Sequence, residues 1–287
     1  MRKKLRLTAL LLLLTLALSA CGSSVPEVPT PPVPTPDPHE GELLVANGMG
    51  GMMWVKDYEN LPVMSLNPKN FVRDGSYINY IGYAAKALRG IDVSEHQREI
   101  DWAAVAADGV EFAIIRVGYR GYSEGGVFED LYFRQNIEGA LENGLRVGVY
   151  FFSQATNAEE AKEEAHFVLD AIADYPIDLP VCYDWEAVHG VGARTDGMSG
   201  KAVTDCAIAF AEEVRAAGYE SAVYFYRDLG YRVYELDRLD GIPFWAAAAG
   251  DTPDFHYAQE IWQYSFTGKV AGVEGDCDLN LYFLPME

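Results

Sequence analysis

The sequence predicts an α/β protein, an irregular TIM-like (β/α) barrel with some helices missing, preceded by a small β-rich segment. From residue 90 onward, short apolar runs alternate with amphipathic stretches of helical period, as in a parallel sheet covered by helices. About eight such runs fall within roughly 195 residues. A chain of that length is too short to contain every helix of a complete barrel. Acidic residues follow several of these runs, where barrel enzymes carry their chemistry. An open doubly wound sheet is the alternative.

Composition and charge narrow the function classes. Of 287 residues, 49% are hydrophobic and 23% charged, which excludes a wholly disordered or fibrous chain. The balance of 22 basic against 43 acidic residues gives a net charge of −21, so nucleic acid is not an expected partner. No HxH, HExxH or CxxC pattern occurs, so no metal site or cofactor is expected. Cys182, Cys206 and Cys277 are expected to be buried thiols, because no pattern orients a histidine beside them.

Residues 1–20 have the plan of a secretory signal peptide. Four basic residues lead into an uncharged, leucine-rich run over residues 7–18, which is short of the about 20 residues that span a bilayer. The ending Leu18-Ser-Ala-Cys21 resembles the bacterial lipobox, whose cysteine is lipidated after cleavage. The resemblance implies an exported cell membrane lipoprotein that faces the cell wall, with a lipid anchor on Cys21.

Two segments precede the barrel. Residues 21–40 form a proline-rich linker that favours polyproline II, a spacer of up to ~60 Å at about 3.1 Å per residue. Residues 41–89 combine aromatic and β-branched residues with Gly, Asn-Pro and Asp-Gly turn signals, which predicts short strands. The cluster Gly48-Met-Gly-Gly51 lacks the ending of a phosphate-binding loop and is expected to be a turn.

Residues 90–287 are expected to form the barrel domain. Three helices are predicted. One begins at a capping box of Asn157 and Glu160, one ends at Gly218, and one runs from Glu129 to Asn143. Buried strands are expected at 112–117, 147–152, 179–183, 222–226, 243–249 and 260–264, with a first short strand ending at Asp92 and a last one around 278–283.

Four carboxylates are candidate catalytic residues: Asp92, Asp184, Glu186 and Asp278. Side chains two apart on a strand face the same way, so Asp184 and Glu186 point together into the barrel mouth with Cα atoms ~6.6 Å apart. One such carboxylate is expected to have a raised pKa while others stay charged, as acid-assisted cleavage of a glycosidic bond requires. The alternative is that these carboxylates cap helices or pair with Arg116.

Aromatic side chains at strand ends are candidates for stacking on sugar rings, and core packing explains each of them equally well. Arg116, on an otherwise apolar strand, is either a partner of the carboxylate cluster, which we favour, or a hydrogen-bond donor to substrate. The candidate aromatic residues are Tyr150, Tyr224, Trp245 and Trp262.

Seven motifs occur in the order found in the family 25 glycoside hydrolases, which the chain resembles over residues 90–283. They are Gly90-Ile-Asp-Val-Ser94, Ile100-Asp-Trp102, Phe112-Ala-Ile-Ile-Arg116, Gly148-Val-Tyr-Phe-Phe-Ser153, Asp184-x-Glu186, Trp262-Gln-Tyr264 and Asp278-Leu-Asn280. The resemblance implies an irregular barrel and a muramidase (lysozyme) that cuts the β-1,4 bond between N-acetylmuramic acid and N-acetylglucosamine in peptidoglycan glycan strands. It implies Glu186 as proton donor, Asp184 as the residue that orients or stabilises the substrate acetamido group, and Asp92 and Asp278 as the rest of the acidic cluster.

Two departures and two other functions remain open. The run Trp245-Ala-Ala-Ala-Ala249 lacks the aromatic residue that the family commonly has nearby, and Arg98 stands where the family often has glycine. One alternative is a catalytically inactive peptidoglycan-binding lipoprotein. The other is a chitinase-like glycosidase, whose longer signature expects aspartates where this chain has Leu179 and Cys182.

Overall fold

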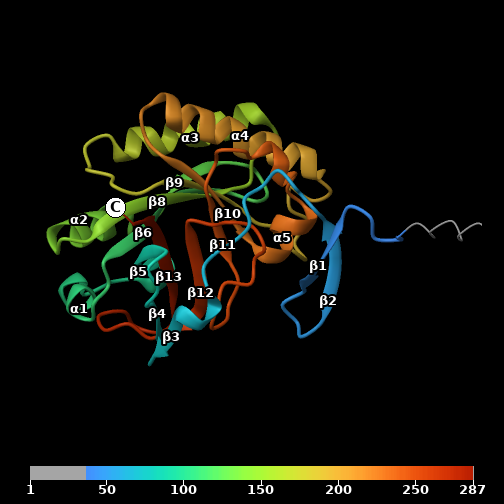
Figure 1. The fold of residues 1–287 in the computed structure, drawn as a ribbon. Helices are drawn as coiled ribbons and strands as arrows, with labels where there is room; N and C mark the ends of the chain where they lie inside the picture. The colour runs from blue at the N-terminus through green and yellow to red at the C-terminus, as the bar shows by residue number, and fades with distance from the viewer. Residues whose placement is uncertain (1–36, 287) are drawn as a thin grey trace, which may run out of the picture. The chain divides into compact units, whose positions relative to one another are not determined.

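Eight strands close a barrel within residues 37–286, the part of the chain that the computed structural model describes (Figure 1). The predicted irregular barrel is therefore confirmed. The proposed signal peptide, Cys21 and most of the proline-rich linker lie outside the described residues. The barrel strands are β5 (Ala85–Val93), β6 (Phe112–Arg120), β8 (Arg146–Ser153), β9 (Val181–Trp185), β10 (Ser221–Tyr226), β11 (Phe244–Ala247), β12 (Ile261–Gly268) and β13 (Cys277–Pro285).

The barrel is parallel except at β13, which corrects the expectation of a wholly parallel barrel. The strand order is β5-β13-β12-β11-β10-β9-β8-β6, and β6 pairs with β5 to close the ring. β13 runs antiparallel to both β12 and β5. Only residues 269–276 connect β12 to β13, too few for the helical crossover that a parallel return needs. The amino end of β13 therefore lies at the same barrel end as the carboxyl ends of the other strands.

Alternation along the strands separates a barrel interior from an outer core. On β9, Cys182 lies in the inner cluster of buried side chains and Tyr183 in the outer one. The outer cluster packs against the helices, as expected for side chains that point to opposite faces of a strand. The interior cluster includes Leu88, Phe112, Ile114, Cys182, Ala222, Tyr224, Trp245, Ile261 and Tyr282, with Tyr150 packed against it.

Helices cover part of the outer surface. α3 and α4 lie side by side across β8 and β9 (Figure 1). None of the helices in residues 37–286 has both the length and the apolar character needed to cross a bilayer. The α-helices are α1 (Trp102–Ala107), α2 (Phe133–Glu142), α3 (Ala158–Ile172), α4 (Gly200–Ala216) and α5 (Arg227–Arg232), and single 3-10 turns occur at Pro68–Asn70, Glu95–Gln97 and Leu236–Arg238.

Two details of the predicted helices were wrong. The helix expected from Glu129 begins at Phe133, because Val127–Glu129 form a short strand, β7, that pairs antiparallel with the end of β6. Asn157 caps α3 by accepting from the backbone N–H groups of the first turn. The capping box is incomplete, because the Glu160 carboxylate accepts from the backbone N–H of Thr156 at 2.7 Å instead of from that of Asn157.

The segment before the barrel contains two hairpins, β1 (Glu42–Ala46) with β2 (Met52–Lys56) and β3 (Phe71–Asp74) with β4 (Tyr77–Tyr80). β5 begins at Ala85, inside the range expected for this segment. The connections β11–β12 and β12–β13 contain no helix in the described residues, so the outer faces of these strands need another cover.

The β3–β4 hairpin provides this cover. The Phe71 ring packs edge-on against Trp262 at 5.5 Å and against Phe283 at 6.0 Å between ring centroids. Ile78 is fully buried, and its backbone N–H points at the Tyr264 hydroxyl. The hairpin thus occupies the place on β12 and β13 that a helix takes in a complete barrel.

Candidate active site

The four candidate carboxylates come from three strands and meet at one end of the barrel. Asp92 lies near the carboxyl end of β5, Asp184 on β9, and Glu186 one residue past β9. Asp278 is the second residue of β13 and pairs directly with Asp92 across the antiparallel ladder. Direct cross-strand neighbours present their side chains on the same face, about 5 Å apart at Cβ. The reversed direction of β13 is therefore what brings Asp278 into the cluster.

Asp92 is held by two side-chain amides. Its Oδ2 accepts hydrogen bonds from Gln263 Nε2 and Asn280 Nδ2, both at 2.7 Å. Each amide is fixed in turn, because the Tyr224 hydroxyl donates to Gln263 Oε1 and the Trp245 indole N–H donates to Asn280 Oδ1, both at 2.9 Å. Burial raises the pKa of Asp92 to about 6, although these hydrogen bonds favour its ionised form.

Asp184 has the least compensated position. Its side chain is buried, and Oδ1 has no hydrogen-bond partner among the described residues. Burial, with the neighbouring charges of Glu186 and Asp92, raises the pKa of Asp184 well above its ordinary value. An unpaired buried carboxylate oxygen is costly unless the group is protonated or a ligand supplies a donor. Asp184 Oδ1 is therefore available to accept a hydrogen bond from a ligand.

Glu186 and Asp278 complete the acidic cluster. Burial and the charge of Asp92 raise the pKa of Glu186 to about 7, and a hydrogen bond with Tyr226 acts in the opposite direction. Burial and Asp92 raise the pKa of Asp278 to about 8. Near neutral pH the cluster therefore keeps protons on some members, as expected for carboxylates that share a small volume.

Arg116 is directed to other carboxylates. Its Nε donates to Asp130 at 2.7 Å, and its Nη2 forms an ion pair with Glu95 at 3.1 Å. We expected a direct partner among the four candidate carboxylates, and the structure pairs Arg116 with none of them. Its charge nevertheless acts to lower the pKa of Asp184. Burial and the charges of Glu186 and Asp92 have larger effects, so Asp184 keeps its raised pKa.

The four candidate aromatic residues divide into two groups. Tyr150, Tyr224 and Trp245 lie inside the barrel, where the Trp245 ring contacts the other two, with ring centroids 5.9 Å from Tyr150 and 4.7 Å from Tyr224. Trp262 points out of the barrel, where its indole N–H donates to the Ala248 carbonyl. Trp262 is thus a core residue beneath the β3–β4 hairpin, and the inward position on β12 belongs to Gln263.

Tyr226 is a site residue that the sequence reasoning missed. It follows Tyr224 by two residues on β10, so both point inward, and it is 37% exposed at the strand's carboxyl end. Besides its hydrogen bond with Glu186, its ring lies 5.8 Å from that of Phe266. Residues two apart on a strand face the same way. Counting two residues on from Tyr224 and from Asp278 therefore identifies Tyr226 and Asn280 as inward-facing residues.

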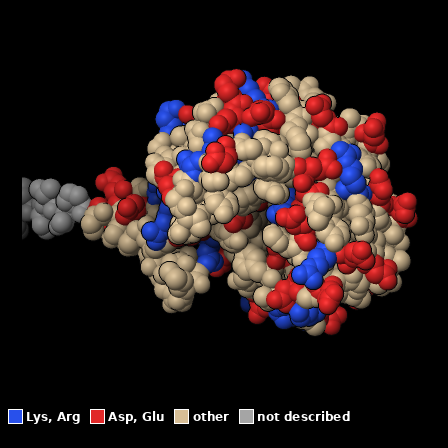
Figure 2. Space-filling view, turned by 180° about the vertical axis from the view of Figure 1, so that it is seen from behind, with Lys and Arg blue, Asp and Glu red and all other residues tan. Residues whose placement is uncertain are grey.

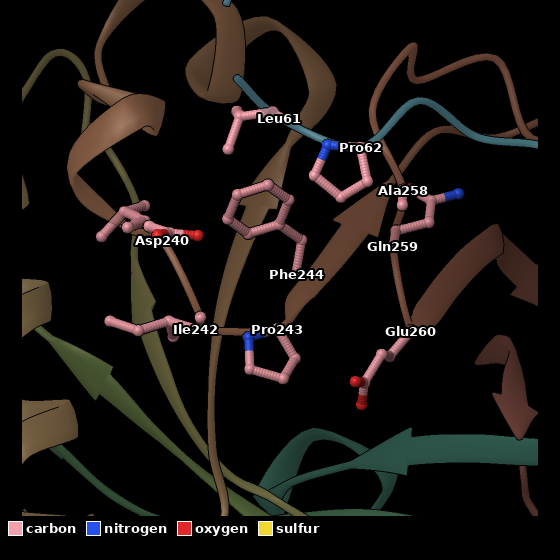
Figure 3. A pocket seen from close by; sticks show the side chains of 11 residues that line it. Leu61, Pro62, Asp240, Ile242, Pro243, Phe244, Ala258, Gln259 and Glu260 are labelled. Atoms are coloured by element: carbon pink, nitrogen blue, oxygen red, sulfur yellow. The ribbon is translucent and has the colours of Figure 1, made fainter. Parts of the chain in front are cut away.

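The remaining expectations concern thiols, metals and other cavities. Cys182, Cys206 and Cys277 are all free and buried, as the sequence indicated. Within residues 37–286 no group of His, Cys, Asp or Glu side chains has a metal-binding arrangement. A pocket of about 330 Å³ lies at the amino ends of the strands, between Leu61 and Phe244 (Figure 3). This pocket is at the opposite end of the barrel from the four candidate carboxylates, and none of them lines it.

Comparisons with known proteins agree with this geometry. The autolytic lysozyme of Clostridium acetobutylicum is 27% identical over 194 residues, which cover 67% of this chain and 55% of that protein. Lysozyme M1 of Streptomyces globisporus is 29% identical over 206 residues, covering 68% and 67%. The modular autolysin LytC of Streptococcus pneumoniae, also solved with a synthetic peptidoglycan ligand, superposes with a TM-score of 0.61 at 25% identity.

The share of each chain that a match covers decides what the match establishes. The superposition on LytC covers 85% of this chain and 57% of that one, so the chain spans little more than half the length of two of these relatives. The family model of the glycosyl hydrolases family 25 matches residues 91–273, most of the barrel and three of the four carboxylates. By this match and by its fold, the chain belongs to glycosyl hydrolases family 25.

Proposed function

We propose that the protein is a lysozyme that cleaves the β-1,4 bond between N-acetylmuramic acid and N-acetylglucosamine in peptidoglycan. Family membership and the lysozyme names of two relatives support a wall-hydrolysing glycosidase. The peptidoglycan ligand of the LytC structure supports the same substrate class. Figure 2 shows acidic side chains over much of one face of the molecule, which fits an uncharged sugar backbone better than a polyanion.

In the proposed reaction, Glu186 is the proton donor. Its pKa of about 7 keeps a substantial protonated fraction near neutral pH, and it lies at the barrel mouth beside the hydroxyl of Tyr226. Glu186 gives its proton to the glycosidic oxygen as the bond from that oxygen to the anomeric carbon breaks. A general acid is most effective when its pKa is close to the working pH.

The observation that carries the proposed mechanism is the unpaired Oδ1 of Asp184. Asp184 and Glu186 belong to the same strand end, so neither is evidently placed below the sugar ring as a nucleophile. The substrate has its own nucleophile, the oxygen of the 2-acetamido group, and substrate assistance is a recognised route in glycosidases. We assign Asp184 the role of accepting the acetamido N–H and balancing the positive charge that develops there.

The bond changes then balance without a protein nucleophile. The acetamido oxygen bonds to the anomeric carbon while the leaving oxygen takes the Glu186 proton. Water next attacks the anomeric carbon, the acetamido oxygen leaves, and the proton released from water returns to Glu186. Two displacements at one carbon give net retention of configuration.

Digestion of purified peptidoglycan tests this proposal. The new reducing end is expected on N-acetylmuramic acid, with an initial β-anomer in proton NMR of fresh product. Asp184→Asn is expected to lower turnover more than substrate affinity, and glycan without the muramic acid N-acetyl group is expected to be cut very poorly. An initial α-anomer would refute the mechanism, and a trapped glycosyl-enzyme would assign the nucleophile to the protein.

The same assay separates the other functions. Release of new ends from chitin but not from peptidoglycan would indicate the chitinase-like glycosidase. Binding to peptidoglycan with no new reducing end would indicate the inactive wall-binding lipoprotein. Retention of four clustered carboxylates favours the active lysozyme over the inactive lipoprotein. Leu179 and Cys182 stand where the chitinase signature has aspartates, which favours the lysozyme over the chitinase-like glycosidase.

We further propose that the protein is exported and held at the membrane by lipid on Cys21. The support is the sequence pattern of residues 1–21, together with relatives that are named lysozymes. A lipidated Cys21 followed by a proline-rich spacer would let the barrel reach glycan strands from the membrane surface.

A further inference from the structure

A buried glutamine, Gln154, connects the end of β8 to the main chain at Glu186. Gln154 has no exposed surface. Its Nε2 donates to the carbonyl oxygens of Glu186 and Ser153, both at 2.9 Å. Its Oε1 accepts from the Thr195 hydroxyl at 2.8 Å. All the hydrogen-bonding capacity of Nε2 and one lone pair of Oε1 are therefore used within the protein.

The carbonyl of Glu186 needs such a donor because of where the strand ends. β9 stops at Trp185, so Glu186 lies in irregular chain past the parallel ladder. Buried carbonyl groups outside regular structure depend on side chains or water for hydrogen bonds. Gln154, the residue after the neighbouring strand β8, supplies this bond and fixes the point from which the Glu186 side chain leaves the backbone.

The chain that follows Glu186 is tied to the same place. Thr195, which is 4% exposed, donates to Gln154, and Arg194 Nη1 donates to the Gln154 carbonyl at 3.0 Å. Arg194 also forms a bidentate pair with Glu160 in the first turn of α3, at 2.6 and 3.0 Å. The loop that carries Glu186 is thus held to Gln154 and, through Arg194 and Glu160, to the long helix α3.

From these contacts we propose that Gln154 is a positioning residue that sets the location of the Glu186 carboxyl through its main chain. The inference rests on the proposed role of Glu186 as proton donor. Gln154 itself does not touch the reacting atoms. Misplacement of a catalytic group by about 1 Å can cost a factor of 10² in rate, so a bond that fixes the donor acts on turnover rather than on substrate affinity.

Loss of the Gln154 amide is also expected to change how Glu186 titrates. Burial holds the pKa of Glu186 above its ordinary value, and a released main chain lets the carboxyl move toward water. The alkaline limb of the activity profile then moves to lower pH. The titratable groups that act on Glu186 or respond to it are Asp92 on β5, Asp184 on β9, Tyr224 and Tyr226 on β10, Tyr234 after α5, and Asp278 on β13.

Gln154→Met tests the proposal, since it keeps length and volume and removes both hydrogen-bonding atoms. We expect kcat on peptidoglycan to fall roughly 10- to 100-fold with KM within about twofold, and the alkaline midpoint to fall by about half a pH unit or more. Gln259→Met is the matched control. Gln259 is also buried, with 6% of its surface exposed, at the other barrel end, and its amide has no hydrogen-bond partner among the described residues. It is expected to leave kcat and the pH profile unchanged.

Thr195 provides a second, milder test if Gln154→Met does not fold. Thr195→Val removes the hydroxyl that orients the Gln154 amide and is expected to shift the alkaline midpoint in the same direction, while Thr195→Ser retains the wild-type profile. An unchanged midpoint in the folded Gln154 variant would overturn the proposal, even if activity fell. If Gln154→Met folds poorly, an unchanged midpoint in Thr195→Val would overturn it.

Glu186→Gln separates this inference from the proposed function. If Glu186→Gln is inactive and Gln154→Met behaves as wild type, only the positioning role fails. If Glu186→Gln retains activity, the proton donor is misassigned and the positioning role fails with it.

Discussion

Asp184 and Glu186 lie two residues apart, yet their surroundings give them different properties. Asp184 is buried with one carboxylate oxygen unpaired, whereas Glu186 lies at the mouth beside Tyr226. Asp92, between two amide donors, is the most firmly held member of the cluster. Differences of this kind are what divide acid, base and orienting roles among carboxylates of the same type.

Replacement of Glu186 by glutamine is the most direct test at the residue scale. Glu186→Gln keeps the size and hydrogen bonding of the side chain but has no transferable proton. Wall hydrolysis is expected to fall by at least the roughly 10²–10⁴ assigned to general acid catalysis, with little change in melting temperature. Release of reducing ends measures this loss, and activity within tenfold of the wild type would mean that another residue is the acid.

The raised pKa values also predict how stability depends on pH. Burial raises the pKa of Asp92 to about 6, of Glu186 to about 7 and of Asp278 to about 8, all above their values in an unfolded chain. Between about pH 4 and pH 8 the folded state therefore binds more protons than the unfolded state, and the free energy of unfolding falls as pH rises through this window.

Thermal melting at a series of pH values measures this effect. The melting temperature is expected to fall between pH 4.5 and pH 8, and Asp278→Asn is expected to flatten that fall because it removes one titrating group and a like charge. Asp174→Asn, at an exposed position in the turn after α3, is the control and retains the wild-type slope. A steeper fall in Asp278→Asn than in the wild type would contradict the assignment.

At the residue scale, the sequence predicted the acidic residues better than their partners. The order and spacing of motifs identified all four carboxylates, which the structure places together. For Trp262 the sequence left sugar contact and core packing open, because β12 is buried on both sides and its apolar pattern does not tell which alternate residues point inward. The structure places Trp262 in the outer core. The partners of Arg116 depend on loops whose paths a sequence does not specify.

Among the secondary-structure elements too, some features were predicted from the sequence and others were not. The strands and the two long helices were predicted within a few residues, because buried apolar runs and amphipathic faces are local patterns. The direction of β13 was not predicted, because it depends on the length of one connection and on where the barrel closes. The start of α2 was missed because Val127–Glu129 pair with the extended end of β6 instead of continuing the helix.

The β3–β4 hairpin gives a testable consequence at the element scale. Ile78→Ala removes a fully buried side chain between hairpin and barrel and is expected to cost about 2–5 kcal/mol of stability, with unchanged activity per folded molecule. Ile81→Ala, three residues on and 64% exposed, is the matched control and is expected to change stability by less than about 0.5 kcal/mol. Chemical denaturation measures both, and equal effects would show that the hairpin does not brace the barrel.

The whole molecule combines an acidic barrel domain with an N-terminal stretch of different composition. The 43 acidic residues against 22 basic ones give a net charge of −21, and Figure 2 shows acidic side chains spread over one face with basic ones among them. The described residues from Gly41 onward belong to one unit, so the hairpins and the barrel are expected to act as a single body. Attachment to the membrane would then depend on the residues before it.

Cys21→Ala tests that attachment. If Cys21 is lipidated, the variant is expected to move from the membrane fraction to the medium while its activity on isolated peptidoglycan is unchanged. Fractionation followed by immunoblotting measures the distribution, and mass spectrometry of the wild type detects the lipid. Membrane retention in the variant, with no lipid on the wild type, would exclude the anchor.

The insertion of β13 between β12 and β5 has a consequence for when the molecule becomes active. A chain emerges from the ribosome or a translocation channel from its N-terminus, so β5 is present long before β13. Until β13 arrives, Asp92 lacks Asn280, which is 188 residues away in sequence, and lacks its cross-strand neighbour Asp278. Closure of the ring therefore assembles the acidic cluster in one late step, and the chain is expected to gain hydrolase activity only when folding is complete.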